Sequence, residues 1–243
     1  MKSFDYRSLI GSLERVAQST RPDVQRAVLF CASFQSNPST TAKKWALRIL
    51  QYLVTTRHET LRWWGPVPGR PAPHAQLVVH TDADFASCPK TSKSYSGITF
   101  ALDGNGAPFD WVSERQSSVA KCNNRAEAIA LSRAMEETHS YYVPFLAELG
   151  TRDHKALILS DSQPSVNKLD QFSSRTRTRA ENVMLSRSRE IMRKNQTVLG
   201  WCDTDAMHAD ALMKRVTTST LARLVMHLLG QISTWYSGGS YQT

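Results

Sequence analysis

The 243-residue sequence lacks features that would place it in a membrane or secreted class. No stretch approaches the roughly 18 consecutive apolar residues of a membrane-spanning helix, and the first residues lack the apolar core of a signal peptide. The four cysteines are widely separated, without a C-x-x-C pair or a Cys/His cluster at zinc spacing. The sequence therefore predicts free thiols and a cytoplasmic, or alternatively nuclear, protein that does not contact a membrane.

Motifs of several large enzyme classes are also missing. The sequence contains no G-x-x-x-x-G-K-[ST] phosphate loop, no G-x-G-x-x-G after a strand, no H-E-x-x-H and no G-x-S-x-G elbow. What it does contain is positive charge, because 30 Lys and Arg residues against 21 Asp and Glu give a formal net charge of +9. This charge favours a polyanionic partner, although a basic surface that serves solubility is an equal alternative at this stage.

Helical patterns fill the first quarter of the chain. Apolar residues at three- and four-residue spacing predict a helix that ends at Pro22, a second one capped by Asp23, and a third capped by Ser39 or Thr40. A segment this short buries little surface by itself, so we expect it to pack against the rest of the chain. Four prolines within residues 65–73 then predict a stiff linker.

The patterns after the linker predict an α/β fold, a mixed five-stranded sheet with flanking helices. We expect strands at 76–85, 94–102, 108–112, 156–160 and 197–202, and helices at 124–149, 166–169, 181–193 and 208–229. Pro144 should kink or split the longest helix. The expected organisation is a helical segment at 1–64, a linker at 65–74, the α/β domain at 75–230 and a flexible tail at 231–243.

Four acidic residues stand where acids are unusual. Asp82 and Asp161 end predicted strands, Glu127 lies on a partly apolar helix face, and Asp210 is in the first turn of the last helix. Each one alone fits a loop or cap residue, but strand-end acids from adjacent strands converge at one sheet edge. Clustered carboxylates repel unless a cation lies among them, and oxygen ligands favour Mg²⁺ or Mn²⁺. Because paired metals suit phosphodiester cleavage, the four acids in a basic protein predict nucleic-acid hydrolysis.

Short segments along residues 5–215 resemble the Pol polyproteins of copia-type LTR retrotransposons. Similar to the end of the reverse transcriptase region are Tyr6-Arg-Ser-Leu-Ile-Gly-Ser-Leu13, Thr20-Arg-Pro-Asp-Val24 and Trp45-Ala-Leu-Arg-Ile-Leu-Gln-Tyr-Leu53. Similar to the ribonuclease H region are Thr81-Asp-Ala-Asp-Phe-Ala86, Ser94-Tyr-Ser-Gly97, Arg125-Ala-Glu-Ala-Ile-Ala-Leu131, Ser160-Asp-Ser-Gln163 and Ala209-Asp-Ala-Leu-Met-Lys214. The resemblance implies a ribonuclease H-like fold behind thumb- or connection-like helices, in a fragment of such a polyprotein.

The resemblance also implies an activity, the hydrolysis of the RNA strand of an RNA–DNA hybrid. Two Mg²⁺ ions, which Mn²⁺ can replace, would be held by Asp82, Glu127, Asp161 and Asp210. His208 would assist proton transfer or product release, as in cellular ribonucleases H, and Asp84 is expected to be a surface or supporting residue. The sequence departs from the copia pattern at Cys122-Asn-Asn-Arg-Ala-Glu127, which resembles cellular ribonucleases H, and at Asp161-Ser-Gln163, where an Asn of the pattern is replaced by Ser.

A basic stretch from 175 to 194 has seven Lys and Arg residues against two Glu, which favours contacts with phosphates. The predicted nucleic-acid-binding residues are Asn123, Asn124, Gln163, Arg175, Arg177, Arg179 and Arg187. The expected partners are the hybrid and the upstream reverse transcriptase polypeptide. Two alternatives stay open: a domesticated module that binds nucleic acid without cleaving it, and a DNA strand-transferase, whose usual order of Asp, Asp, Glu does not match the order here.

Overall fold

The computed structural model describes residues 5–64, 76–102, 106–149, 156–170, 179–195, 197–214 and 218–231. The predicted linker at 65–74, Arg175, Arg177 and all of the predicted tail except its first residue lie outside the described residues. In the described part of the chain, no helix is long and apolar enough to cross a membrane.

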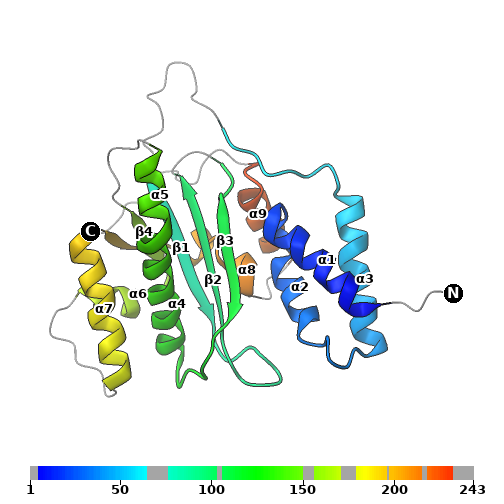
Figure 1. The fold of residues 1–243 in the computed structure, drawn as a ribbon, viewed down its shortest axis with the longest axis horizontal. Coiled ribbons are helices and arrows are strands. Elements are labelled where there is room, and N and C mark those ends of the chain that lie inside the picture. The colour runs from blue at the N-terminus through cyan, green and yellow to red at the C-terminus, as the bar shows by residue number, and fades with distance from the viewer. Residues whose placement is uncertain are drawn as a thin grey trace.

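Helices α1 (Tyr6–Ser19), α2 (Gln25–Ala32) and α3 (Thr40–Thr55) form a cluster with its own core (Figure 1). The Ser39 hydroxyl caps α3, as predicted, by accepting a hydrogen bond from the backbone N–H of Ala42. Asp23 was expected to cap α2, and this prediction is wrong. A 3-10 turn, η1 (Pro22–Val24), precedes α2, and the Asp23 carboxylate instead accepts two hydrogen bonds from the Arg21 guanidinium.

A five-stranded sheet follows the helix cluster, and its strand order is β3-β2-β1-β4-β5. The strands are β1 (Leu77–Asp84), β2 (Tyr95–Leu102), β3 (Asp110–Arg115), β4 (Leu157–Ser160) and β5 (Val198–Trp201). The first three are antiparallel neighbours, whereas β4 runs parallel to β1 and β5 parallel to β4. The predicted mixed five-stranded sheet with flanking helices is confirmed.

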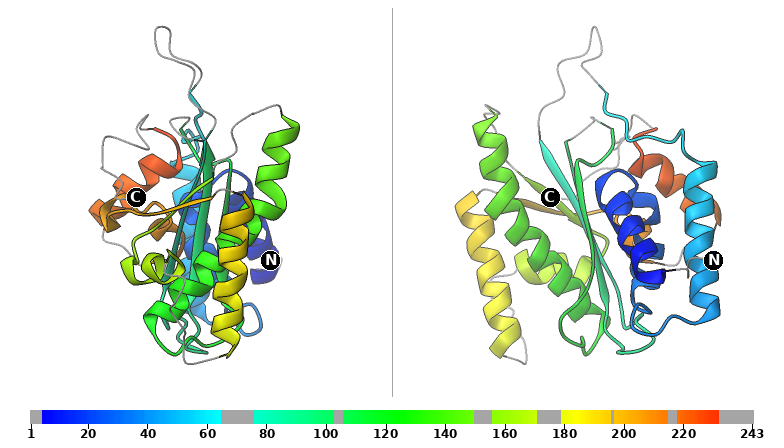
Figure 2. Two further views of the ribbon diagram at one scale, coloured as in Figure 1. Left: turned by 90° about the vertical axis from the view of Figure 1, so that its left-hand side faces the viewer. Right: turned by 45° about the vertical axis from the view of Figure 1, so that its right-hand side comes forward.

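Helices cover both faces of the sheet. Successive side chains of a strand point to opposite faces, so apolar residues of β1 pack against helices on each side. On one face, Leu77 and Val79 of β1 join a core with α4 (Asn123–Glu137), α6 (Gln163–Asp170) and α7 (Arg179–Asn195). On the other face, Val78 packs with the segment around α8 (Asp210–Met213). Helix α9 (Thr218–Leu228) and the helix cluster lie on this second side (Figures 1 and 2).

Two of the predicted helices are interrupted in the structure. The helix predicted at 124–149 is split, as Pro144 suggested, into α4, a π-helical turn at Thr138–Tyr142, and α5 (Val143–Glu148). The single last helix predicted at 208–229 is wrong, because the chain leaves the helical conformation at Lys214, where ψ is 153°. Helix α8 is held close against β2: a Cβ atom at Gly97 would lie 2.8 Å from the Ala209 carbonyl oxygen.

The helix cluster packs against the sheet unit, as its small size led us to expect. The Trp111 indole N–H of β3 donates a hydrogen bond to the Ala17 carbonyl at 3.1 Å. The Arg26 guanidinium of α2 donates to the Met213 carbonyl at 2.5 Å and lies 4.2 Å from the centre of the Tyr95 ring. Buried hydrogen bonds therefore join the two parts.

Replacing Trp111 by Phe should lower the free energy of unfolding by about 1–2 kcal/mol, because the buried Ala17 carbonyl loses its donor. Urea denaturation followed by circular dichroism measures this difference. The matched control is Trp63→Phe, since the Trp63 side chain is 51% exposed and should tolerate the change. Equal unfolding midpoints for wild type and Trp111→Phe would contradict the prediction.

Candidate active site

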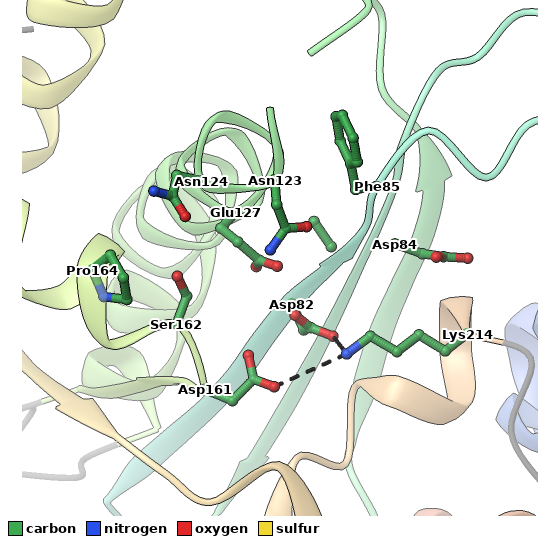
Figure 3. A pocket seen from close by; sticks show the side chains of 11 residues that line it. Asp82, Asp84, Phe85, Asn123, Asn124, Glu127, Asp161, Ser162, Pro164 and Lys214 are labelled. Atoms are coloured by element: carbon green, nitrogen blue, oxygen red, sulfur yellow. Dashed lines mark ion pairs between the residues drawn. The ribbon is translucent and has the colours of Figure 1, made fainter. Parts of the chain in front are cut away.

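Three of the predicted acids converge where strands β1 and β4 end. Asp82 lies near the end of β1, and Asp161 directly follows β4; because these strands are parallel neighbours, both side chains reach one sheet edge. Glu127 comes from the second turn of α4, which crosses that edge. One carboxylate oxygen from each of the three residues lies within 4.8 Å of the others (Figure 3).

These acids line an open pocket of about 500 Å³. Its wall also includes Asn123 and Asn124 at the start of α4, Ser162 after β4, and Asp84 near the end of β1 (Figure 3). Backbone N–H groups at a helix start attract anions, so this wall suits a phosphate group. The pocket therefore combines metal-type ligands with groups that can hold a phosphate.

The fourth acid, Asp210, is joined to the others through Lys214. The Lys214 Nζ atom lies 2.5 Å from Asp82 Oδ2, 2.9 Å from Asp210 Oδ1 and 4.0 Å from Asp161 Oδ2. The sequence reasoning gave Lys214 no role, although its place one helical turn after Asp210 was a usable signal. Its ammonium group is the cation that separates these carboxylates.

Burial, together with neighbouring carboxylates, raises the pKa of Asp82, Glu127 and Asp161. Burial, followed by the charges of Asp82 and Asp161, raises the pKa of Glu127 to about 10. Burial also raises the pKa of Asp82 to about 6, and Asp210 adds to this effect whereas Lys214 opposes it. Burial lowers the pKa of Lys214, but the charges of Asp82 and Asp210 outweigh that effect and raise it overall. The cluster thus favours additional positive charge.

The oxygen atoms of the pocket fit a divalent cation. Asp82 Oδ1 and Glu127 Oε2 are buried and receive no hydrogen bond from any residue that the structure describes. Buried carboxylate oxygens of this kind are ligands for Mg²⁺ or Mn²⁺, whereas zinc sites generally use His and Cys. The group of converging ligands found in the described part of the chain consists of Asp and Glu alone.

Partners outside the pocket hold Asp161 in place. The exposed Trp201 side chain donates its indole N–H to the Asp161 carbonyl at 3.0 Å, and the Thr204 hydroxyl donates to Asp161 Oδ2 at 3.1 Å. Trp201 is 40% exposed although it lies in strand β5. Neither contact was predicted, because both join residues about 40 positions apart.

His208 does not line the pocket with the acids. Its side chain is buried, and its ring centre lies 4.6 Å from that of His80 and 4.4 Å from that of His227. Burial, with the neighbouring histidines, lowers the pKa of His208 well below its usual range. This position does not favour the predicted role in proton transfer.

Five of the predicted nucleic-acid-binding residues are described by the structure, and they divide into two groups. Asn123 and Asn124 line the pocket, whereas Gln163, Arg179 and Arg187 do not. The Gln163 side-chain amide donates to Asn167 at 2.8 Å, and Arg187 on α7 lies 3.4 Å from Glu190. The basic helix α7 therefore lies beside the site without forming its wall.

Comparisons with known proteins place the chain among transposon proteins. No protein-family model matches the sequence. The chain is 30% identical over 219 residues to the retrovirus-related Pol polyprotein from transposon TNT 1-94 of Nicotiana tabacum, which covers 89% of the chain and 16% of the polyprotein. A transposon Ty5-1 protein of Saccharomyces cerevisiae is 29% identical over 133 residues, 54% of the chain and 41% of that protein.

Two further similarities come from a pathogen and from a solved structure. Secreted RxLR effector protein 161 of Plasmopara viticola is 34% identical over 137 residues, 56% of the chain and 91% of that protein. The crystal structure of LC11-RNase H1 in complex with RNA/DNA hybrid has a TM-score of 0.44 and 15% identity over 60% of the chain and 99% of that protein. The tobacco match extends over most of the helix cluster and the sheet unit, so the chain is related in sequence to a segment of retrotransposon Pol polyproteins.

Proposed function

We propose that the chain is a ribonuclease H that cleaves the RNA strand of an RNA–DNA hybrid endonucleolytically. The observation that carries the proposal is the convergence of Asp82, Glu127 and Asp161, with Asp210 joined through Lys214, in one open pocket. The relationship to Pol polyproteins supports the substrate class, because the segments that resemble the ribonuclease H region supply all four acids. We further propose that residues 1–64 and 75–230 correspond to the end of a reverse transcriptase and to the ribonuclease H domain.

In this proposal the four carboxylates hold two Mg²⁺ ions, which Mn²⁺ can replace. Bound there, divalent ions would supply activation of the attacking water and stabilisation of the departing 3′-oxygen, chemistry that gives 5′-phosphate and 3′-hydroxyl ends. Asn123 and Asn124, with the backbone N–H groups at the start of α4, bind and orient a phosphate of the RNA strand. Trp201 and Thr204 keep Asp161 oriented toward the pocket.

A second candidate function is a nucleic-acid-binding module that does not cleave. The observation that favours it is Lys214, whose ammonium group lies among the carboxylates and already neutralises part of their charge. Such a module would bind hybrid with or without Mg²⁺. The experiments below separate the two candidates.

The substitution Glu127→Gln should slow hybrid cleavage by about 10²- to 10³-fold, the loss typical of removing one preorganised charged group. Cleavage of a labelled RNA strand in a hybrid with Mg²⁺ measures the rate. Glu136→Gln is the matched control, since Glu136 lies exposed on the same helix. A folded wild type that binds hybrid and never cleaves it would refute the ribonuclease proposal and leave the binding module.

Metal binding at pH 7 should release protons. The pKa of Glu127 is raised to about 10, so this side chain is protonated at pH 7 before the metal binds and must lose its proton to become a ligand. Affinity should accordingly rise with pH. Isothermal titration calorimetry with Mn²⁺, in two buffers of different ionisation enthalpy, counts the protons. An identical binding enthalpy in both buffers would contradict this expectation, and Glu127→Gln should release fewer protons than wild type.

The substitution Lys214→Met should strengthen Mn²⁺ binding, because the ammonium group no longer competes with the metal for Asp82 and Asp210. Breaking a charge-assisted hydrogen bond costs about 1.5–3 kcal/mol, which corresponds to roughly 10- to 100-fold in affinity. The metal-free variant should also unfold at lower urea concentration, since the carboxylates lose their cation. Lys44→Met is the control, on an exposed position of α3. Weaker Mn²⁺ binding by Lys214→Met would show instead that Lys214 supports the metal site.

A further inference from the structure

A second pocket, which we call the interhelical groove, lies between α2 and α3 of the helix cluster and α8 of the sheet unit. Its volume is about 730 Å³. The lining residues used below are Arg26, Phe30, Trp45, Arg48, Tyr52 and Lys214. None of its lining residues was assigned to a site from the sequence, and among them Lys214 also lines the acidic pocket.

The interhelical groove adjoins the acidic pocket. Lys214 lines both of them, and in Figure 3 its side chain extends from the end of α8 to the carboxylates. A second link is the pair of Arg26, in the groove, and Asp84, in the pocket, with 3.9 Å between Arg26 Nη2 and Asp84 Oδ2. A nucleic-acid strand that leaves the acidic pocket on the side of Asp84 and Lys214 therefore enters the groove.

Aromatic side chains form one wall of the groove. Trp45 and Tyr52 lie on the same side of α3, seven residues apart, and remain 42% and 38% exposed although they are large aromatic residues. Phe30 of α2 supports Trp45, with ring centres 5.4 Å apart. The Trp45 ring thus packs against Phe30 and stays partly exposed in the open groove, where it can act as a stacking platform for a nucleic-acid base.

The charge of the groove is positive. Arg48 lies one helical turn after Trp45 and forms no ion pair with any residue of the described ranges. The one acid in the groove wall, Asp23, is neutralised by Arg21, whose Nη2 atom lies 2.7 Å from it. A groove that combines a partly exposed aromatic ring with an arginine one helical turn away fits a strand of bases and phosphates.

We propose that the interhelical groove binds single-stranded nucleic acid that continues from the hybrid, with a base stacked on Trp45 and a phosphate bound by Arg48. The occupant is single-stranded because bases paired in a duplex do not expose their faces. This inference rests on the proposed function, since it takes the hybrid in the acidic pocket as the starting point of the strand.

The test compares two hybrids that are identical except for a single-stranded overhang. Binding to the full chain is measured by fluorescence anisotropy in the Glu127→Gln background, so that the RNA stays intact. We expect the overhang to increase affinity by about 10-fold, within the range that one stacked base and one phosphate provide. Arg48→Gln and Trp45→Leu should each remove most of this gain while leaving affinity for the blunt hybrid unchanged.

Matched controls are Arg15→Gln and Trp63→Leu, which change exposed residues that do not line the groove. Arg48→Gln should also reduce the dependence of log affinity on log salt by about one for the overhang hybrid alone. If Trp45→Leu loses its fold because Phe30 loses a partner, Arg48→Gln still decides the question.

The outcomes separate this inference from the proposed function. If wild type cleaves the blunt hybrid but the groove variants bind the overhang as wild type does, the inference is wrong and the ribonuclease proposal stands. The groove would then be left for a protein segment. If wild type cleaves no hybrid, the ribonuclease proposal is wrong, and the anisotropy series still decides whether the groove binds single strands.

Discussion

Electrostatic repulsion among buried carboxylates is the constraint on which the rest of the structure depends. Asp82, Glu127 and Asp161 come together because strands β1 and β4 end, and helix α4 begins, at the same edge. Their mutual repulsion destabilises the fold, and burial makes this cost larger. Protonation of Glu127 and the ammonium group of Lys214 reduce the repulsion. The same repulsion is what gives the cluster its preference for a divalent cation.

The sequence was sufficient for the features that depend on local pattern and on sheet topology. Asp82 and Asp161 could be placed together because each ends a strand of an α/β sheet, and Ser39 could be placed as a cap because it precedes an amphipathic run. Glu127 and Asp210 were singled out because an acid is unusual at each of their positions, and the family resemblance then implied that they hold metal together with Asp82 and Asp161. Fold class and acidic cluster were therefore accessible before the structure.

What the sequence could not provide depends on contacts between distant residues. Asp23 looked like a helix cap, yet it pairs with Arg21. The last helix is interrupted at Lys214, whose ammonium group contacts Asp82. His208 looked like a site residue from its position before Asp210, but it lies in a buried contact with two other histidines. The interhelical groove could not be predicted, because α2 and α3 precede the predicted linker in sequence whereas α8 follows it.

The close approach of α8 to β2 makes the position of Asp210 depend on the residue at position 97. Asp210 opens α8, and α8 lies so near the backbone of Gly97 that one added methyl group would meet the Ala209 carbonyl and the Met213 side chain. The position of Asp210 therefore depends on the lack of a side chain at Gly97 of strand β2. A sequence that retains all four acids would still place Asp210 differently if the residue at position 97 carried a Cβ atom.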